Sequence, residues 1–478
     1  MRSTIEKLLK DSKAIVGLSL GYVLLALIAG LLTGKLYVVI CLLNYGFVTL
    51  ICNRYNYKSG SIFSPSAVFR IFTLHALVIA PILLDYFDYQ IPFTYVSLVH
   101  EEYLLTWSLL YFLGLLITLA ISWVNVKSRK FRKWRVDGSR FIFYWILLSL
   151  ASLLLQVYVY YLFGGISGYI DIYASGESRD VFRGFGILFL FSESFPILFA
   201  MGVSYLMKTG RISKSLLVPF LLLYALLLIP FGGLRGSRSM FVFRLFMGAG
   251  IFHYSGIKIS RTLLVTGALS TVLFISLYKS YYKNKSFSTG ESISLSAAYQ
   301  EQLVKFILIT DLSRVDVQTL LIHQLERKDS EYELAMGRTY YSALFVMMPT
   351  AVYRAITGNA KPPSKTREGT NLVRGNRSYE SGKKVSYVFG LLGESLLNFG
   401  LYGAVVVFVF FGVLFGFLMD SFRALEVDDS RRVLIPIVSI LVVNLLQGDL
   451  DNNIFFVFKM GLMPYMLLRL SKSTSTDE

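Results

Sequence analysis

The sequence predicts an all-α polytopic membrane protein with about twelve transmembrane helices and one long, partly helical loop on the non-cytoplasmic side. Three observations predict this fold. Of the 478 residues, 55% are hydrophobic and only 16% are charged, whereas soluble proteins are close to a quarter charged. The apolar residues gather in runs that are long enough to cross a bilayer. Basic residues concentrate in alternate loops, as the positive-inside rule requires.

Twelve apolar runs are the predicted spans. Each has about 15–24 residues, which suits a helix that rises 1.5 Å per residue through the hydrocarbon core. In chain order the runs cover 14–33, 36–52, 66–86, 103–125, 141–163, 185–206, 215–231, 238–254, 262–281, 401–419, 433–447 and 454–470. The first run is too long for a signal-peptide core and lacks a convincing cleavage site, so we interpret it as a retained helix.

The basic loop 127–140 sets the predicted orientation. It carries seven Lys and Arg residues against one acid, Asp137, which places it in the cytoplasm. Counting helices outward from it places both termini and three further basic loops on the same side. Their basic residues are Lys208, Arg211, Lys214, Lys258, Arg261, Arg423, Arg431 and Arg432. The net charge of +17 is therefore explained by topology and anionic lipid, and it does not indicate nucleic acid.

This topology divides the chain into three parts. Residues 1–281 form the first nine spans, 282–400 form the large external loop, and 401–478 form the last three spans and a cytoplasmic C-terminus. In the first half of the loop, 292–336, apolar residues recur at helical spacing. They are Leu295, Tyr299, Leu303, Phe306 and Ile309. This periodicity predicts amphipathic helix on the membrane surface.

The turn 231–238, on the outer face between spans seven and eight, is the first candidate site. Its three glycines let the backbone approach a ligand closely. Arg235 and Arg238 carry planar cations that match phosphate oxygens, and Arg238 lies where a helix begins, where free N–H groups favour an anion. We interpret the turn as a diphosphate site at the headgroup level. The alternative is a tight turn whose arginines bind ordinary lipid phosphates.

The second half of the long loop is the second candidate, because basic residues there exceed acidic ones. The basic residues are Arg338, Arg354, Lys361, Lys365, Arg367, Arg374, Arg377, Lys383 and Lys384, the acids are Glu368 and Glu380, and the interleaved tyrosines are Tyr340, Tyr341, Tyr353 and Tyr379. A loop of this size is translocated regardless of its charge, so topology does not explain the excess. Cations and aromatic faces together fit a phosphorylated, lipid-linked sugar, and the alternative is a solvated loop.

Two further polar groups lie near the predicted ends of spans. Glu394 and Asn398 are four residues apart, which puts them on one face of a helix; Glu394 is a candidate general base for a hydroxyl or a helix cap. The segment 449–453, Asp-Leu-Asp-Asn-Asn, offers ligands for a cation or a sugar hydroxyl, or is a plain turn. Its spacing matches no calcium loop.

Three charged residues, Glu193, Arg244 and Lys459, fall inside predicted spans. A charge in lipid is costly, so these side chains are expected to face the bundle interior or to be functional. The sequence has no nucleotide-binding loop, no HExxH and no GxSxG motif, and its four histidines are scattered. We therefore expect no cofactor and no metal site, and we interpret Cys41 and Cys52 as packing thiols.

Three stretches of the second half carry a family resemblance. Gly233-Leu-Arg-Gly-Ser-Arg238 is a Gly/Arg turn before a helix. Gly337-Arg-Thr-Tyr340 leads through Pro349 and Arg354 to Lys361-Pro362, and Gly393-Glu394 leads through Asn398-Phe-Gly400 to Gly403. In this order and topology they resemble the Wzy-type oligosaccharide repeat-unit polymerases, or O-antigen polymerases. One departure is that Thr350, not arginine, follows Pro349, which leaves the role of Arg354 open.

The resemblance implies a GT-C-like fold in the bacterial inner membrane. It also implies metal-independent, inverting glycosyl transfer between undecaprenyl-diphosphate-linked oligosaccharides on the outer leaflet, in the synthesis of lipopolysaccharide O-antigen, capsule or exopolysaccharide. The leaving diphosphate needs fixed cations. The residues expected to serve the reaction are Arg235, Arg238 and Glu394 in catalysis, and Arg338, Tyr340, Tyr341, Arg354, Lys361, Arg374 and Asn398 in substrate binding. Expected partners are membrane lipid, a chain-length regulator and a flippase.

Two other functions remain open at this point. An O-antigen ligase shares the helix count and the long loop, but such ligases use a loop histidine, and the only one between 282 and 400 is His323, outside the three stretches. A transporter or flippase for lipid-linked sugar would show paired repeats and charges at mid-membrane. The sequence has no evident repeat, and its candidate charges cluster at one face.

Overall fold

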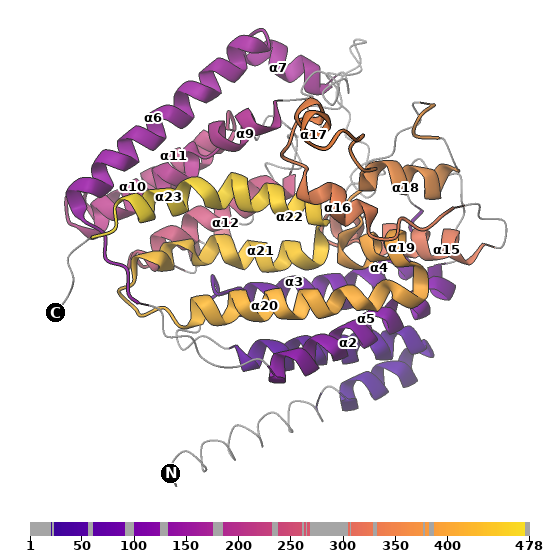
Figure 1. Ribbon diagram of the computed structural model, residues 1–478. Coiled ribbons are helices and arrows are strands. Elements are labelled where there is room, and N and C mark those ends of the chain that lie inside the picture. The colour runs from indigo at the N-terminus through magenta and orange to yellow at the C-terminus, as the bar shows by residue number, and fades with distance from the viewer. Residues whose placement is uncertain are drawn as a thin grey trace, which may run out of the picture.

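The structure is a computed structural model, and its secondary structure is helical. It describes residues 21, 23–55, 61–90, 100–124, 132–174, 185–231, 238–260, 262–263, 265–267, 305, 307–327, 332–375, 378–381 and 387–473. Within these ranges the single β-type contact is an isolated bridge between Val136 and Lys472. The prediction of an all-α fold is confirmed for this part of the chain (Figure 1).

Eight helical segments in the described ranges are long and apolar enough to cross a membrane. They are α2 (Leu36–Arg54), α3 to α4 (Pro65–Leu74, His75–Ile79 and Ala80–Tyr86), α5 (His100–Val124), α6 (Gly138–Leu162), α9 and α10 (Gly186–Ser192 and Phe195–Lys208), α19 and α20 (Gly390–Gly403 and Val407–Arg423), α21 with its preceding turn (Ser430–Leu434 and Ile435–Gln447), and α22 to α23 (Leu450–Phe456, Val457–Leu462 and Met463–Leu470). All eight coincide with predicted spans, and the protein is a polytopic helical membrane protein.

Three more predicted spans appear as shorter apolar helices. They are Val23–Thr33, α11 (Leu217–Leu228) and α12 (Arg238–Tyr254). The start of α12 at Arg238 is the helix start that the sequence predicts. The remaining predicted span, 262–281, lies almost entirely outside the described residues. Cys41 and Cys52 are buried, free thiols in α2, as predicted.

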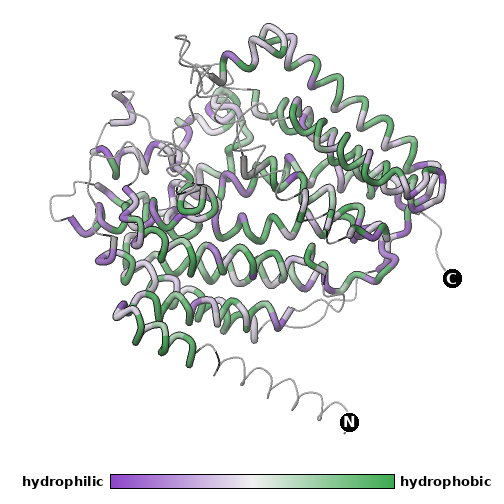
Figure 2. Tube along the Cα trace, turned by 180° about the vertical axis from the view of Figure 1, so that it is seen from behind, coloured by the Kyte–Doolittle hydropathy of each residue, from purple (hydrophilic) through white to green (hydrophobic). Residues whose placement is uncertain are grey.

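The basic loops meet at one end of the bundle, as predicted from their charge. Lys133 forms an ion pair with Asp428, and the Ser430 amide donates to the Trp134 carbonyl at 3.0 Å. Ser473, near the C-terminus, donates from its amide to the Arg135 carbonyl at 2.9 Å. This end carries the C-terminus in Figure 1. Figure 2, which colours the Cα trace by hydropathy, shows hydrophobic residues along the helices and hydrophilic ones concentrated at the two ends.

The described helices of the long loop lie at the opposite end (Figure 1). They are α15 (Val315–Glu326), α16 (Arg338–Leu344), α17 (Thr350–Thr357) and α18 (Lys365–Arg374). The outer ends of the membrane-length helices and α7 (Gly165–Ala174) lie at the same end. The helix that leads into the predicted span 401–419 begins at Gly390, within the predicted loop, and its residues Leu392 to Asn398 are buried.

The prediction that 292–336 folds on the membrane surface is wrong for α15, which is buried among α4, α5 and α19. Every residue from Val315 to Ile322 is buried. Gln318 makes this burial possible, because its side chain accepts from the Trp107 indole at 2.7 Å and donates to the Phe389 carbonyl at 2.7 Å. Residues 292–304 lie outside the described ranges.

Candidate functional site at the outer end of the bundle

The site begins with a break in α19. Gly400 has φ 65° and ψ −168°, a conformation that favours glycine, and the helix is interrupted there. The preceding carbonyls of Leu397 and Asn398 therefore lack their usual helical partners. They accept instead from the amides of Ala335 and Met336, at 3.0 and 2.9 Å. These two hydrogen bonds attach the chain that leads into α16 to α19.

Asn398 extends this attachment through its side chain. Its Oδ1 accepts from the amides of Gly337 at 2.9 Å and Thr339 at 3.4 Å, at the start of α16. Its Nδ2 donates to the Thr339 hydroxyl at 2.6 Å and to the Glu394 carbonyl at 2.7 Å. The first N–H groups of a helix have no partner within the helix, so Asn398 caps α16 from another element. The predicted shared face of Glu394 and Asn398 is confirmed.

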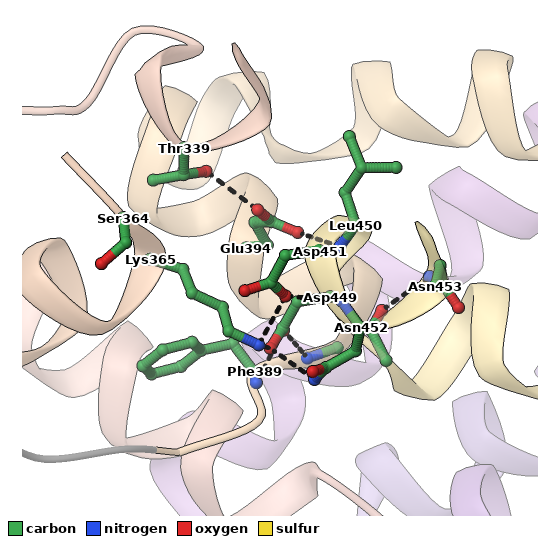
Figure 3. Close-up of polar contacts among 12 residues, drawn as sticks. Thr339, Ser364, Lys365, Phe389, Glu394, Asp449, Leu450, Asp451, Asn452 and Asn453 are labelled. Carbon is green, nitrogen blue, oxygen red and sulfur yellow. Dashed lines mark hydrogen bonds and ion pairs between the residues drawn. The ribbon is translucent and has the colours of Figure 1, made fainter. Parts of the chain in front are cut away.

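Glu394 is fully engaged and buried. It is 2% exposed; its Oε1 accepts from the Thr339 hydroxyl at 3.0 Å and its Oε2 from the Leu450 amide at 2.7 Å. Leu450 is the first residue of α22, so the carboxylate lies at a helix N-terminus, where negative charge is favoured. The sequence left open whether Glu394 is a cap, and it is one, but of α22 and not of its own helix (Figure 3).

Asp449 makes the reciprocal contact. It directly precedes α22, but its Oδ1 accepts from the amides of Phe389 and Gly390, both at 2.8 Å, at the start of α19. Gly390 has φ 72°, and an added Cβ would lie 3.2 Å from the Leu446 carbonyl. Glycine is therefore required where the chain turns towards the Asp449 carboxylate.

Lys365 joins the outer helices to this arrangement. Its ammonium group forms ion pairs with Asp449 and, at 2.8 Å, with Asp451, while its side chain is 8% exposed. Burial lowers the pKa of Lys365, but the two carboxylates outweigh this effect and the pKa is raised. Figure 3 shows the Lys365 side chain extending from α18 to these acids. We call Thr339, Lys365, Glu394, Asn398, Asp449 and Asp451 the outer polar cluster.

Beside this cluster lies an open polar pocket of about 300 Å³. Its lining residues come from the segment before α16, from the start of α16, from α18 and from the chain after α18: Tyr332, Glu333, Arg338, Arg367, Glu368, Asn371 and Glu380. The Tyr332 hydroxyl donates to the Leu397 carbonyl at 3.1 Å, so the pocket and the outer polar cluster share α19 as their support. We call this the outer pocket.

The remaining substrate-binding candidates are spread over the outer helices. Arg354 on α17 and Arg374 at the end of α18 are exposed. Lys361 donates to the Met348 carbonyl at 3.0 Å, and burial lowers its pKa. Tyr341 is 49% exposed and open to a sugar ring. Tyr340 packs on Phe399, with ring centroids 6.0 Å apart, and it faces the interior rather than a ligand.

Of the Gly/Arg turn, Arg235 lies outside the described residues, and Arg238 is described only as the first residue of α12. The residue before the turn's glycines, Phe231, is held from within the bundle. Its carbonyl accepts from Arg244, which also pairs with Glu193.

The three charges flagged inside the spans meet there. Glu193 pairs with both Arg244 and Lys459, and Glu193 and Arg244 are 1% and 3% exposed. The prediction that they face the bundle interior is confirmed. We call them the membrane triad.

Sequence reasoning did not single out Tyr332 and Asn371, and it counted Lys365 and Glu368 only as part of the overall charge of the loop. Asp449 and Asp451 were found as a pair, but not their connection to Lys365. Ser364 offered a signal, since a serine before a polar run is typical of a helix start. Its hydroxyl accepts from the Arg367 amide at 3.4 Å, which orients α18 with Lys365 and Glu368 towards the bundle.

No protein family, curated protein or solved structure matches this chain. The fold and the site define a helical membrane protein with a buried charged cluster and a polar pocket at one end. Within the described residues, no group of three His, Cys, Asp or Glu side chains is arranged to hold a metal ion.

Proposed function

We propose that the protein is a polymerase of undecaprenyl-diphosphate-linked oligosaccharide repeat units. In the proposed reaction, a hydroxyl oxygen of the acceptor sugar attacks the anomeric carbon of the donor, with inversion. The bond from that carbon to the diphosphate oxygen breaks, and the hydroxyl proton passes to a base. The product would become O-antigen, capsule or exopolysaccharide.

One observation carries the proposal: α16 and α18, with their arginines and tyrosines, are fixed onto two membrane-length helical segments. Asn398, near the break in α19, holds α16, and Lys365 holds α18 to Asp449 at the start of α22. A lipid-linked oligosaccharide has an apolar chain in the bilayer and a sugar beside it. A polymerase for it needs a rigid polar site at the border of an apolar bundle, since loosely placed groups catalyse poorly.

Within this proposal the cations have separate tasks. Arg235 and Arg238 would neutralise the leaving diphosphate, because charge develops there in the transition state. Lys361 would support them from the outer helices, with Arg338, Tyr341, Arg354 and Arg374 contributing to saccharide binding. Glu394 remains the candidate base. Since Thr339 and Leu450 occupy its oxygens, it can accept a sugar proton only when one of these donors gives way.

The finer topology belongs to the same proposal. Twelve spans, both termini in the cytoplasm and a site on the outer leaflet of the bacterial inner membrane follow if the end formed by the basic loops is cytoplasmic. A GT-C-like arrangement, a chain-length regulator and a flippase are expectations of the resemblance.

The test uses substrate that accumulates when the gene is deleted in its native host. Lipid-linked oligosaccharides extracted from the deletion strain are given to the purified protein in vesicles, with EDTA present, and the glycans are separated by size. A ladder of longer glycans is expected. A single product on lipid A core would indicate a ligase. Movement between leaflets without growth would indicate a flippase, and either result would end the proposal.

A further inference from the structure

The outer pocket has a mixed lining whose charge differs from that of the loop around it. Three carboxylates, Glu333, Glu368 and Glu380, face two guanidinium groups, Arg338 and Arg367. With all five of these side chains charged, the lining carries a net charge of minus one. The segment 338–374 as a whole is strongly basic. The pocket is therefore a poorer site for the phosphates of a carrier lipid than the basic surface around it.

Its hydrogen-bonding groups are only partly used by the protein. Glu368 is 7% exposed, yet among the described residues its hydrogen bond is a long one, 3.5 Å from the Tyr332 hydroxyl. A buried carboxylate normally has several close donors, because burying it without them is costly. Glu368 therefore offers acceptor capacity to a ligand that brings its own donors.

Two arginines of the lining supply donors. Arg338 is held by its own backbone, with Nε donating to the Ala335 carbonyl at 3.0 Å and Nη2 to the Leu334 carbonyl at 3.4 Å. Arg367 is held by Glu380 at 2.9 Å. Because Arg338 donates to carbonyls rather than to a carboxylate, its remaining N–H groups and its charge are available. Asn371 adds a side-chain amide to the lining, and its Oδ1 accepts from the Tyr379 backbone amide at 3.4 Å.

We propose that the outer pocket binds one uncharged sugar ring of a saccharide. A sugar hydroxyl is both donor and acceptor, so it satisfies Glu368 and Arg338 at once, which neither a phosphate nor an amine does. The volume of about 300 Å³ is within the range of small-ligand sites. The role of this sugar as part of the polymerase acceptor rests on the proposed function, but the binding itself does not.

The binding test uses the full-length protein in detergent and soluble probes. Saturation-transfer NMR is recorded with lactose and N,N′-diacetylchitobiose as neutral probes, and with glucuronic acid and inorganic pyrophosphate as anionic ones. We expect transfer to at least one neutral disaccharide and a binding constant weakened about tenfold or more in Glu368→Gln, the size of one hydrogen bond to a charged group. Glu426→Gln, at the opposite end of the bundle, is the matched control.

Asn371→Ala is the second variant. Asn371 is only half-buried, and its replacement leaves the Lys365 ion pairs that hold α18 in place. Thermal midpoints confirm that each variant is folded. Absence of transfer to both neutral probes overturns the proposal. So does equal binding of pyrophosphate, or neutral binding that neither pocket variant weakens. The assay contains no lipid-linked substrate, so its outcome is independent of whether glycan ladders form. If both variants still form glycan ladders with an unchanged dependence on acceptor concentration, only the proposed role of the pocket in polymerisation is overturned.

Discussion

Glu394, in α19, caps the start of α22, and Asp449, which directly precedes α22, caps the start of α19. Glu394 accepts from the Leu450 amide at 2.7 Å, and Asp449 accepts from the Phe389 and Gly390 amides at 2.8 Å. Two membrane-length helices are thus locked at the same level by carboxylates at their N-terminal ends. Lys365 supplies the positive charge that lets these acids be buried together.

Removal of Asp449 is expected to destabilise the protein strongly. Asp449→Ala leaves Lys365 buried with only Asp451 and leaves two helix amides without an acceptor, a cost on the order of 3–5 kcal/mol. The thermal unfolding midpoint in detergent measures the effect. Asp428→Ala, which breaks an exposed ion pair with Lys133, is the control and is expected to cost less than about 1 kcal/mol.

The coupling between Lys365 and Asp449 has a separate prediction. Lys365→Met removes the buried cation, so Asp449→Asn should cost less in the Lys365→Met background than in the wild type. A double-mutant cycle on thermal midpoints reports this difference. Strict additivity of the two substitutions would show that the ion pair does not join α18 to α22.

The free energy of unfolding should fall as pH rises through the range in which the Asp316 carboxyl loses its proton. Burial raises the pKa of this carboxyl from 3.8 to about 6, against the opposing hydrogen bond from Thr310. Between these values the folded state keeps a proton that the unfolded state has released, so stability declines with rising pH and the full penalty applies above about pH 6.

Asp316→Asn should remove this penalty. The variant is expected to be more stable than the wild type above pH 6 by on the order of 3 kcal/mol, with a gap that shrinks towards pH 4. Thermal midpoints of both proteins across this range provide the comparison. A gap that stays constant with pH would mean that Asp316 is not protonated in the folded state.

Disrupting the membrane triad is expected to destabilise the protein as much as disrupting the outer polar cluster. Glu193→Gln deprives Arg244 and Lys459 of their shared carboxylate, which should cost about 3–5 kcal/mol because both cations are held inside the bundle. Asp420→Asn, which weakens a partly exposed pair with Arg423 at 3.1 Å, is the matched control. Equal midpoints for the two variants would contradict a structural role for Glu193.

The arginines of the Gly/Arg turn have a functional prediction. Arg235→Lys and Arg238→Lys keep the charge but lose the planar fork that matches phosphate oxygens, so polymer length in cells should fall sharply without a change in protein amount. The gel profile of the surface glycan measures it. Arg211→Lys, in a basic loop at the other end, is the control. An unchanged profile in both turn variants would remove the turn from the proposed mechanism.

Orientation can be tested with single cysteines. The two native thiols are buried, so background labelling should be low. Ala355→Cys on α17 should react with an impermeant maleimide from outside the inner membrane, and Ser213→Cys should react only after the membrane is opened. Both positions are exposed in the structure. The reverse pattern would invert the proposed topology.

Hydropathy determined most of the membrane-length elements in advance. In a bilayer each backbone polar group must be satisfied within its own helix, so a local run of apolar residues is sufficient to specify a span. The same local logic predicted the start of α12 at Arg238, the shared face of Glu394 and Asn398, and the gathering of the basic loops at one end.

Only the tertiary structure decided which polar groups meet. The sequence found Glu394 and the segment 449–453 as separate candidates, and it placed Lys365 in a general basic excess. It also placed α15 on the surface, although Gln318 meets Trp107 inside the bundle. Such pairings depend on how each helix is rotated and shifted against neighbours far away in the chain. Packing of the whole bundle sets those rotations, and no local pattern of residues encodes them.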